Sequence, residues 1–215
     1  MRPTAEAAPP LSNPPSPVSD GLIDKAALRR IAGQRRADAH AVDPAERAAR
    51  LADQGAGLIV HGSGLVVSGY IAMRAEIDPL PLLVRLHDAG ATIALPVVVA
   101  ANRPLVFRAW TPGGPLEPAA FGTRVPPATA PEVAPMVMLV PLLAFDPQCF
   151  RLGYGGGFYD RTLASARLAG RTVRAYGLAY SEQAMDSLPL EDHDVPLDAV
   201  ITPDGVVWPA GAKSS

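Results

Sequence analysis

The apolar residues of this chain fall into short continuous runs, and this feature most restricts the folds that the chain can adopt. The longest run extends from Val137 to Phe145 and is interrupted by Pro141. It is far shorter than the roughly 18 apolar residues that cross a bilayer. Continuous runs of this length are typical of strands that are buried on both faces. We therefore predict that residues 137–143 form an internal strand of a sheet that is covered by helices.

Further apolar runs alternate with helical patterns along the chain. Strands are predicted at 65–73, 92–99, 105–110, 173–178 and 199–201, and helices at 24–36, 43–58, 82–87 and 158–168. Strands separated by helical segments indicate crossover connections and helices on both faces of the sheet. The predicted fold is α/β: a single three-layer α/β/α domain with a mostly parallel central sheet, Rossmann-like in class.

Length and composition indicate the domain organisation. The chain has 215 residues, which suits one domain, since single domains commonly hold about 100–200 residues. The first twenty residues contain six prolines and no apolar stretch, which predicts a disordered leader over 1–20 rather than a secretory signal. We expect the folded domain over 21–209, a flexible tail over 210–215, and a cytoplasmic protein.

Charge and cysteine content exclude several classes of partner and site. The chain has 19 Lys and Arg against 21 Asp and Glu, so it lacks the basic excess that is typical of nucleic-acid binding. No apolar run is long enough to span a membrane. The single cysteine, Cys149, excludes an intramolecular disulfide and a multi-cysteine zinc site, and we interpret it as a small buried residue. We expect a monomer that acts on small molecules.

Two helix-start signals precede the first predicted strand. Asp24 is a candidate N-cap, and Asp43–Glu46 combines an N-cap, a proline at the first helical position and an acid three residues after the cap. Lys25 and Arg29 lie four residues apart and share one helix face, so both can reach one anionic ligand. The alternative is a solvated basic face, which would also include Arg30, Arg35 and Arg36.

The segment from Arg151 to Asp160 carries the strongest chemical signal. It reads Arg-Leu-Gly-Tyr-Gly-Gly-Gly-Phe-Tyr-Asp and lies between a predicted strand and a predicted helix, where open α/β sheets bind ligands. Its glycines let backbone N–H groups approach anionic oxygens, and the helix N-terminus adds partial positive charge. The segment is neither a Walker loop nor a dinucleotide fingerprint. It predicts a phosphate-binding loop, although a bare glycine cluster is also typical of a flexible turn.

Side chains in the same segment favour a nucleotide with its metal ion. Arg151 can pair with phosphate oxygens, and Tyr154 and Tyr159 can stack on or hydrogen-bond to a flat ligand. Asp160 is a hard oxygen ligand suited to Mg²⁺. The alternative for Asp160 is a helix-start carboxylate that interacts with the helix dipole.

This segment and the preceding Leu139–Asp146 resemble the signature of the 5-formyltetrahydrofolate cyclo-ligase family. The resemblance continues in order at Lys25–Arg29, Tyr70–Glu76 and His193–Asp198, and thus covers about residues 24–202. It implies an enzyme that uses ATP to phosphorylate the formyl oxygen of 5-formyltetrahydrofolate. A neighbouring folate nitrogen then closes the ring to 5,10-methenyltetrahydrofolate, and ADP and phosphate are released.

The resemblance also implies roles for individual residues. No covalent nucleophile is expected, because phosphoryl transfer depends on positioning and charge stabilisation. Mg²⁺ is the implied cofactor, held by Asp160 and Asp194, with the nearby acids Glu191, Asp192 and Asp198 as alternatives to Asp194. ATP is expected to contact Lys25, Arg29, Arg151, Leu152, Gly153, Tyr154, Gly155, Gly156, Gly157, Phe158 and Tyr159. The folate is expected to contact Ile71, Glu76, Tyr154, Gly155, Gly156, Gly157 and Phe158.

Aromatic residues on or beside the predicted strands have two interpretations. Phe107, Trp110 and Phe121 either wall the folate pocket or belong to the core. Residues 112–135 are rich in Pro and Gly, which predicts a long ordered loop over one end of the sheet.

Two other functions remain compatible with these residues. A non-catalytic regulator would bind nucleotide or folate without turnover. A sugar-phosphate or CoA-handling enzyme could use a similar scaffold, because fold alone does not determine function. Retention of the cationic helix face, the glycine segment, Glu76 and Asp160 in one chain favours the cyclo-ligase.

Overall fold

The computed structural model describes residues 24–59, 64–191 and 194–211, and a seven-stranded sheet lies at its centre. The order is β11-β10-β9-β6-β1-β2-β3, with the antiparallel β3 (Val106–Ala109) and β11 (Gly205–Val207) at the edges. The inner strands are parallel: β1 (Val66–Ser68), β2 (Thr92–Val97), β6 (Val137–Pro141), β9 (Arg174–Leu178) and β10 (Ala199–Thr202). The predicted α/β class with a mostly parallel sheet is confirmed.

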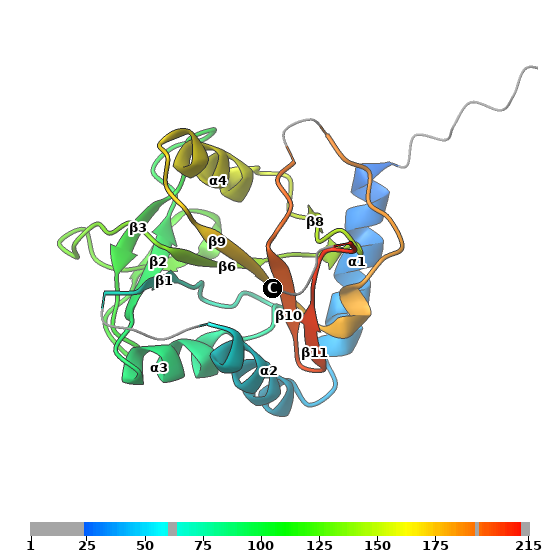
Figure 1. The fold of residues 1–215 in the computed structure, drawn as a ribbon, viewed down its shortest axis with the longest axis horizontal. Coiled ribbons are helices and arrows are strands. Elements are labelled where there is room, and N and C mark those ends of the chain that lie inside the picture. The colour runs from blue at the N-terminus through cyan, green and yellow to red at the C-terminus, as the bar shows by residue number, and fades with distance from the viewer. Residues whose placement is uncertain (1–23, 60–63, 192–193, 212–215) are drawn as a thin grey trace, which may run out of the picture.

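Helices cover both faces of this sheet (Figure 1). α2 (Pro44–Leu58) and α3 (Leu80–Asp88) lie on one face, and α4 (Phe158–Leu168) lies on the other. Each face has its own core, which contains Leu51 and Leu82 under α2 and α3, and Leu163 under α4. The three predicted layers are therefore present.

The first helix, α1 (Lys25–His40), belongs to a separate small core. Ala32 of α1 packs with Leu152 and Leu188. Leu152 lies on a hairpin formed by β7 (Ala144–Phe145) and β8 (Arg151–Leu152), which the sequence did not predict. This packing holds α1 next to the segment that follows β8.

The chain order of the strands creates a switch point between β1 and β6. From β1 the chain continues to β2 and β3 on one side, whereas β6, β9, β10 and β11 follow on the other side. The crevice outside the carboxyl ends of strands at such a point is the usual ligand site of open α/β sheets. The fold thus indicates where a site should be sought.

The helix starts agree only in part with the sequence prediction. Asp24 caps α1, because its Oδ1 accepts a hydrogen bond from Ala26 N at 2.9 Å. Asp43 occupies the predicted N-cap position of α2, but it has φ 45° and makes no side-chain cap hydrogen bond. The three residues 41–43 must turn the chain from α1 into α2, and a left-handed residue completes that short turn. Pro44 still occupies the first turn of α2.

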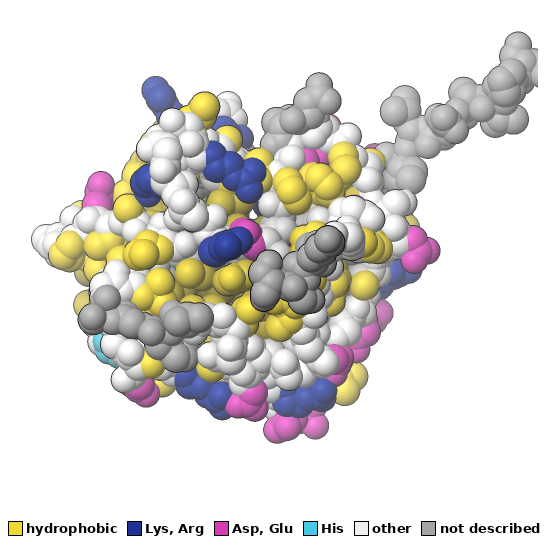
Figure 2. All heavy atoms as spheres, in the orientation of Figure 1, with side chains coloured by type: hydrophobic (Ala, Val, Ile, Leu, Met, Phe, Trp, Pro, Cys, Tyr) yellow, Lys and Arg dark blue, Asp and Glu magenta, His cyan; other side chains and the backbone are white. Residues whose placement is uncertain are grey.

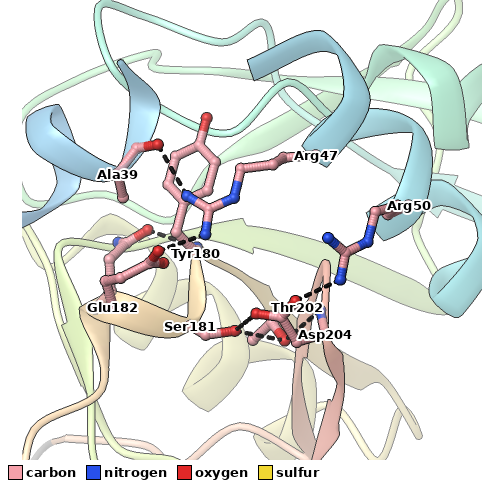
Figure 3. A network of polar contacts seen from close by, with 9 residues as sticks. Ala39, Arg47, Arg50, Tyr180, Ser181, Glu182, Thr202 and Asp204 are labelled. Carbon is pink, nitrogen blue, oxygen red and sulfur yellow. Dashed lines mark hydrogen bonds and ion pairs between the residues drawn. The ribbon is translucent and has the colours of Figure 1, made fainter. Parts of the chain in front are cut away.

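Arginines of α2 attach this helix to the end of the sheet (Figure 3). Arg47 pairs with Glu182 of η2 (Ser181–Gln183), donates to the Ala39 carbonyl at 2.8 Å and lies over the Tyr180 ring. Arg50 pairs with Asp204, which also accepts a hydrogen bond from Ser181. On the face drawn in Figure 2, cationic and anionic side chains alternate along α2 and α3.

Some boundaries differ from the predicted ones. The first strand ends at Ser68 rather than near residue 73, because the chain leaves the sheet after Gly69 N bonds to the Ala94 carbonyl. The predicted loop over 112–135 contains β4 (Glu117–Pro118), η1 (Ala120–Gly122) and β5 (Arg124–Val125).

The predicted leader over 1–20 and residues 212–215 of the predicted tail lie outside the described residues. No helix in the described part of the chain is long and apolar enough to cross a membrane.

Candidate active site

A cavity of about 670 Å³ lies at the carboxyl ends of β1, β2 and β6. Tyr70 follows β1, while Pro96 and Pro141 belong to the last residues of β2 and β6, and all three line the cavity. It is therefore located at the switch point of the sheet. All the residues predicted to bind ATP, folate or metal line this one cavity: Lys25, Arg29, Ile71, Glu76, Arg151, Leu152, Gly153, Tyr154, Gly155, Gly156, Gly157, Phe158, Tyr159, Asp160 and Asp194.

The glycine segment connects β8 to α4 and is held from two sides. Arg29 of α1 donates from Nε to the Gly153 carbonyl at 3.1 Å, and Arg161 of α4 donates to the Gly156 carbonyl at 2.6 Å. Gly155 has φ 94°, a backbone conformation that residues other than glycine rarely adopt. A Cβ added at Gly155 would lie 3.4 Å from the Arg29 guanidinium. These contacts favour an ordered loop over the flexible turn.

Lys25 and Arg29 both face the cavity, as their shared helix face predicts. Lys25 Nζ forms an ion pair with Glu191 Oε1 at 2.6 Å. The Glu191 backbone N–H donates to Asp194 Oδ2 at 2.7 Å. Glu191 and Asp194 therefore border the cavity, and Glu191 does so next to α1.

Arg151 and Asp160, predicted to bind phosphate and metal respectively, are paired with each other. Arg151 Nη2 lies 2.6 Å from Asp160 Oδ1, and the two side chains are 5% and 19% exposed. Val195 fixes the pair by accepting from Arg151 at 3.0 Å and donating to Asp160 at 3.4 Å. Over the described residues, no group of three or more His, Cys, Asp or Glu side chains could hold a metal ion.

Glu76 is buried although it lines the cavity. Its side chain is 5% exposed, and its Oε1 accepts a hydrogen bond from the Tyr154 hydroxyl at 2.6 Å. Its Oε2 accepts from Met73 N at 2.9 Å. Burial, followed by the hydrogen bond to Glu76, raises the pKa of Tyr154 to about 12, so this phenol is a donor at neutral pH.

Arg36 is a buried residue behind the cavity wall that the sequence prediction missed. It was grouped with the solvated basic face, yet it is 5% exposed and contacts both Tyr154 and Glu76. A signal was present in the spacing: Arg36 follows Arg29 by seven residues, which places both on the same stripe of a helix. Nothing in the sequence indicated that this stripe was covered.

The aromatic residues divide between the cavity and the core. Phe121 lines the cavity, is 74% exposed, and its ring centroid lies 6.3 Å from that of Phe158. Phe107 and Trp110 are buried in the two cores. Phe121 has φ 60°, and the cavity-lining residues Arg74 and Asn102 also have positive φ. Such strained backbone positions tend to gather at functional sites.

Comparisons with known proteins agree on one family. The sequence profile of the 5-formyltetrahydrofolate cyclo-ligase family matches residues 23–203. The 5-formyltetrahydrofolate cyclo-ligase of Escherichia coli (strain K12) is 35% identical over 144 residues, which cover 64% of this chain and 77% of that protein. The 5-formyltetrahydrofolate cyclo-ligase of Mycolicibacterium smegmatis is 36% identical over 145 residues, covering 62% and 71%.

Solved structures show the same relationship. The 5,10-methenyltetrahydrofolate synthetase of Aquifex aeolicus superimposes with a TM-score of 0.67 at 26% identity, covering 89% of this chain and 95% of that chain. The 5,10-methenyltetrahydrofolate synthetase of Mycoplasma pneumoniae superimposes with a TM-score of 0.64 at 22% identity, covering 84% and 99%. At that lower identity the likeness concerns the fold alone.

Proposed function

The chain belongs to the 5-formyltetrahydrofolate cyclo-ligase family, and on this premise we propose that it uses ATP with Mg²⁺ to cyclise 5-formyltetrahydrofolate to 5,10-methenyltetrahydrofolate. One observation carries the proposal: the cationic face of α1, the glycine segment and the buried Glu76 line a single cavity. A cyclisation that is driven by phosphoryl transfer needs nucleotide and folate side by side. A single chain supplies all the proposed residues, so a monomer suffices.

The chemistry requires that the formyl oxygen become a leaving group. The formyl oxygen attacks the γ-phosphorus of ATP, the bond from γ-phosphorus to the bridging oxygen breaks, and ADP leaves. A neighbouring folate nitrogen then attacks the formyl carbon and loses its N–H proton to solvent, the carbon–oxygen bond breaks, and phosphate leaves with that oxygen. The protein must place the reactants and balance phosphate charge.

The proposed nucleotide subsite consists of cations and backbone donors. Lys25, Arg29 and Arg151 provide positive charge on the cavity wall, and the loop before α4 offers backbone N–H groups at a helix N-terminus. No side chain is asked to act as a nucleophile. Cys149 is fully buried in the core under α4, and its burial raises the pKa of its thiol to about 11.

The proposed folate subsite centres on Glu76. An ionised carboxylate can accept about four hydrogen bonds, and Glu76 accepts two from the described residues. It can therefore accept two more from the N–H groups of the pterin edge. Phe158 and Ile71 border the same cavity and supply apolar surface for the pterin ring.

The number of proposed protein ligands suits Mg²⁺ better than a metal ion whose ligands all come from the protein. Asp160 and Asp194 both line the cavity, and Mg²⁺ usually takes one or two carboxylates and completes its shell with water and substrate phosphates. Bound there, the ion would neutralise charge on the phosphates. Each carboxylate has one oxygen, Oδ2 of Asp160 and Oδ1 of Asp194, that makes no hydrogen bond within the described residues.

The direct test mixes the protein with 5-formyltetrahydrofolate, ATP and MgCl₂ and follows the absorbance of the methenyl product. We expect a rise that requires ATP. Binding of both ligands without this rise would instead support the non-catalytic regulator, and turnover of a sugar phosphate without ATP would support the sugar-phosphate enzyme.

Two substitutions test the assignment of the subsites. Arg29→Ala should raise the KM for ATP, and Glu76→Gln the KM for the folate, each by about tenfold or more, because a charge-assisted hydrogen bond is worth about 1.5–3 kcal/mol. Arg30→Ala is the matched control, since Arg30 is exposed and does not line the cavity. Equal effects of Glu76→Gln on both KM values would contradict its role.

A further inference from the structure

Arg36 is a buried cation that lies behind the cavity wall rather than on it. Its Nη1 donates a hydrogen bond to the Tyr154 hydroxyl and lies 3.6 Å from Glu76 Oε1. Its guanidinium carbon lies 5.4 Å from the centroid of the Tyr154 ring. Both contacted residues line the cavity, whereas Arg36 does not. Any influence of Arg36 on a ligand must therefore pass through Glu76 and Tyr154.

These contacts join three separate parts of the chain. Arg36 belongs to α1, Glu76 follows β1, and Tyr154 belongs to the glycine segment. The Tyr154 hydroxyl accepts from Arg36 and donates to Glu76, so one hydroxyl connects the cation to the carboxylate. The orientation of the carboxylate depends on both partners.

Stability alone gives a poor reason for this arrangement. A buried ion pair loses hydration on both sides, and well-packed apolar residues of similar volume are often as stabilising or more so. The Arg36 Nε is buried and lacks a hydrogen-bond partner among the described residues, which adds to the cost. The guanidinium thus faces Glu76 and Tyr154, and one of its N–H groups, at Nε, is left without a hydrogen bond among the described residues.

We infer that Arg36 is a positioning residue of the folate subsite: it keeps Glu76 oriented for the N–H groups of the pterin, directly and through the Tyr154 hydroxyl. This inference rests on the proposed function. It assigns to Arg36 a share of folate recognition without any contact with the folate.

The test separates KM from kcat in Arg36→Met. Loss of the guanidinium should raise the KM for 5-formyltetrahydrofolate at least about tenfold, as expected when an unpaired carboxylate reorients, while the KM for ATP changes less than about twofold. A purely structural role would reduce the folded fraction, which lowers the apparent kcat and leaves both KM values unchanged. Arg35→Met is the matched control, because Arg35 is the exposed neighbour on α1 and its one side-chain hydrogen bond among the described residues goes to the Ala184 carbonyl, at 3.4 Å.

Two milder variants keep the inference testable if Arg36→Met does not fold. Arg36→Lys retains the charge but loses the planar fork, and Tyr154→Phe removes the connecting hydroxyl. Each should raise the folate KM a few-fold. The double variant should raise the folate KM by less than the product of the two single effects, because part of the effect of Arg36 passes through the Tyr154 hydroxyl.

The outcomes distinguish the two proposals. Without ATP-dependent turnover in the unmodified protein, the proposed function itself would be rejected. Normal turnover, together with a folate KM in the Arg36 variants that equals that of Arg35→Met, would overturn the positioning role and leave the function intact. Fully additive effects of Arg36→Lys and Tyr154→Phe would also overturn it.

Discussion

At the scale of single residues, Asp160 has two roles to combine: its ion pair with Arg151 and the proposed binding of Mg²⁺. Its Oδ1 is held by Arg151 and by the Val195 N–H, whereas the metal proposal uses the oxygen that these partners leave free. A carboxylate whose orientation is set by neighbouring donors is a common arrangement for metal ligands, because those donors reduce the freedom that the ligand loses on binding. The pairing with Arg151 is thus compatible with a metal role.

Asp160→Asn separates the metal role from the role of holding Arg151. If Asp160 binds Mg²⁺, the variant should need about tenfold more Mg²⁺ for half-maximal turnover, and excess Mg²⁺ should restore part of the rate. If Asp160 only holds Arg151, added Mg²⁺ should have no effect. A magnesium titration of initial rates at saturating ATP decides between them, and Asp194→Asn in parallel shows whether the second carboxylate shares the ion.

At the scale of elements, close contact between α2 and α3 depends on a glycine. A Cβ at Gly55 of α2 would lie 2.6 Å from Leu82 Cδ2 of α3, and Leu82 is fully buried. A Cβ at Gly57 of the same helix would meet nothing within 4 Å. Gly55 therefore lies on the face of α2 that contacts α3, whereas the exposed Gly57, two residues further along the helix, points away from that contact.

The same two glycines make a matched pair for measurement. Gly55→Ala should lower the free energy of unfolding by about 1–3 kcal/mol, because the added methyl forces the fully buried Leu82 side chain to shift within a packed core. Gly57→Ala should leave it unchanged or raise it by up to about 1 kcal/mol, because alanine favours the helix. Urea unfolding of both variants checks the difference, and an equal loss in both would show that the contact at Gly55 is not limiting.

At the scale of the whole molecule, acidic groups buried in their neutral form should weaken the fold at alkaline pH. Burial raises the pKa of Cys149 to about 11 and that of Tyr180 to about 12, whereas unfolded Cys and Tyr titrate near about 8.5 and 10. The folded state thus binds these protons more tightly. Their contribution to stability is complete below about pH 8.5 and is lost as pH rises through the folded-state pKa values.

Unfolding measured between pH 8 and pH 11 tests this expectation. The urea midpoint should fall with pH, and Cys149→Ala should remove roughly 1–3 kcal/mol of that decline, at about 1.4 kcal/mol per unit of pKa difference. The comparison uses the slope rather than the absolute stability, since the substitution also removes packed atoms. An identical slope in the variant would mean that the thiol does not titrate as inferred.

Much of the candidate site was predictable because its residues are close in sequence or share a helix face. The segment 151–160 brings its own cations, glycines and carboxylate together, and the spacing of Lys25 and Arg29 places them on one stripe of α1. Arg36 lies on that stripe too, but its hydrogen-bond partner Tyr154 is 118 residues away. No local pattern reports such a neighbour.

The alternation of strands and helices, the glycine segment before α4 and the cap at Asp24 can all be predicted from local sequence, because each depends on periodicity or on hydrogen bonds within a few residues. Three features depend on tertiary packing instead: Arg36 and Glu76 are buried together, Phe121 lines the cavity while Phe107 and Trp110 fill the core, and the Asp43 side chain makes no cap hydrogen bond to α2. Burial and turn geometry depend on which distant segments meet. These contacts between distant segments form only in the complete fold, so local sequence patterns do not reveal them.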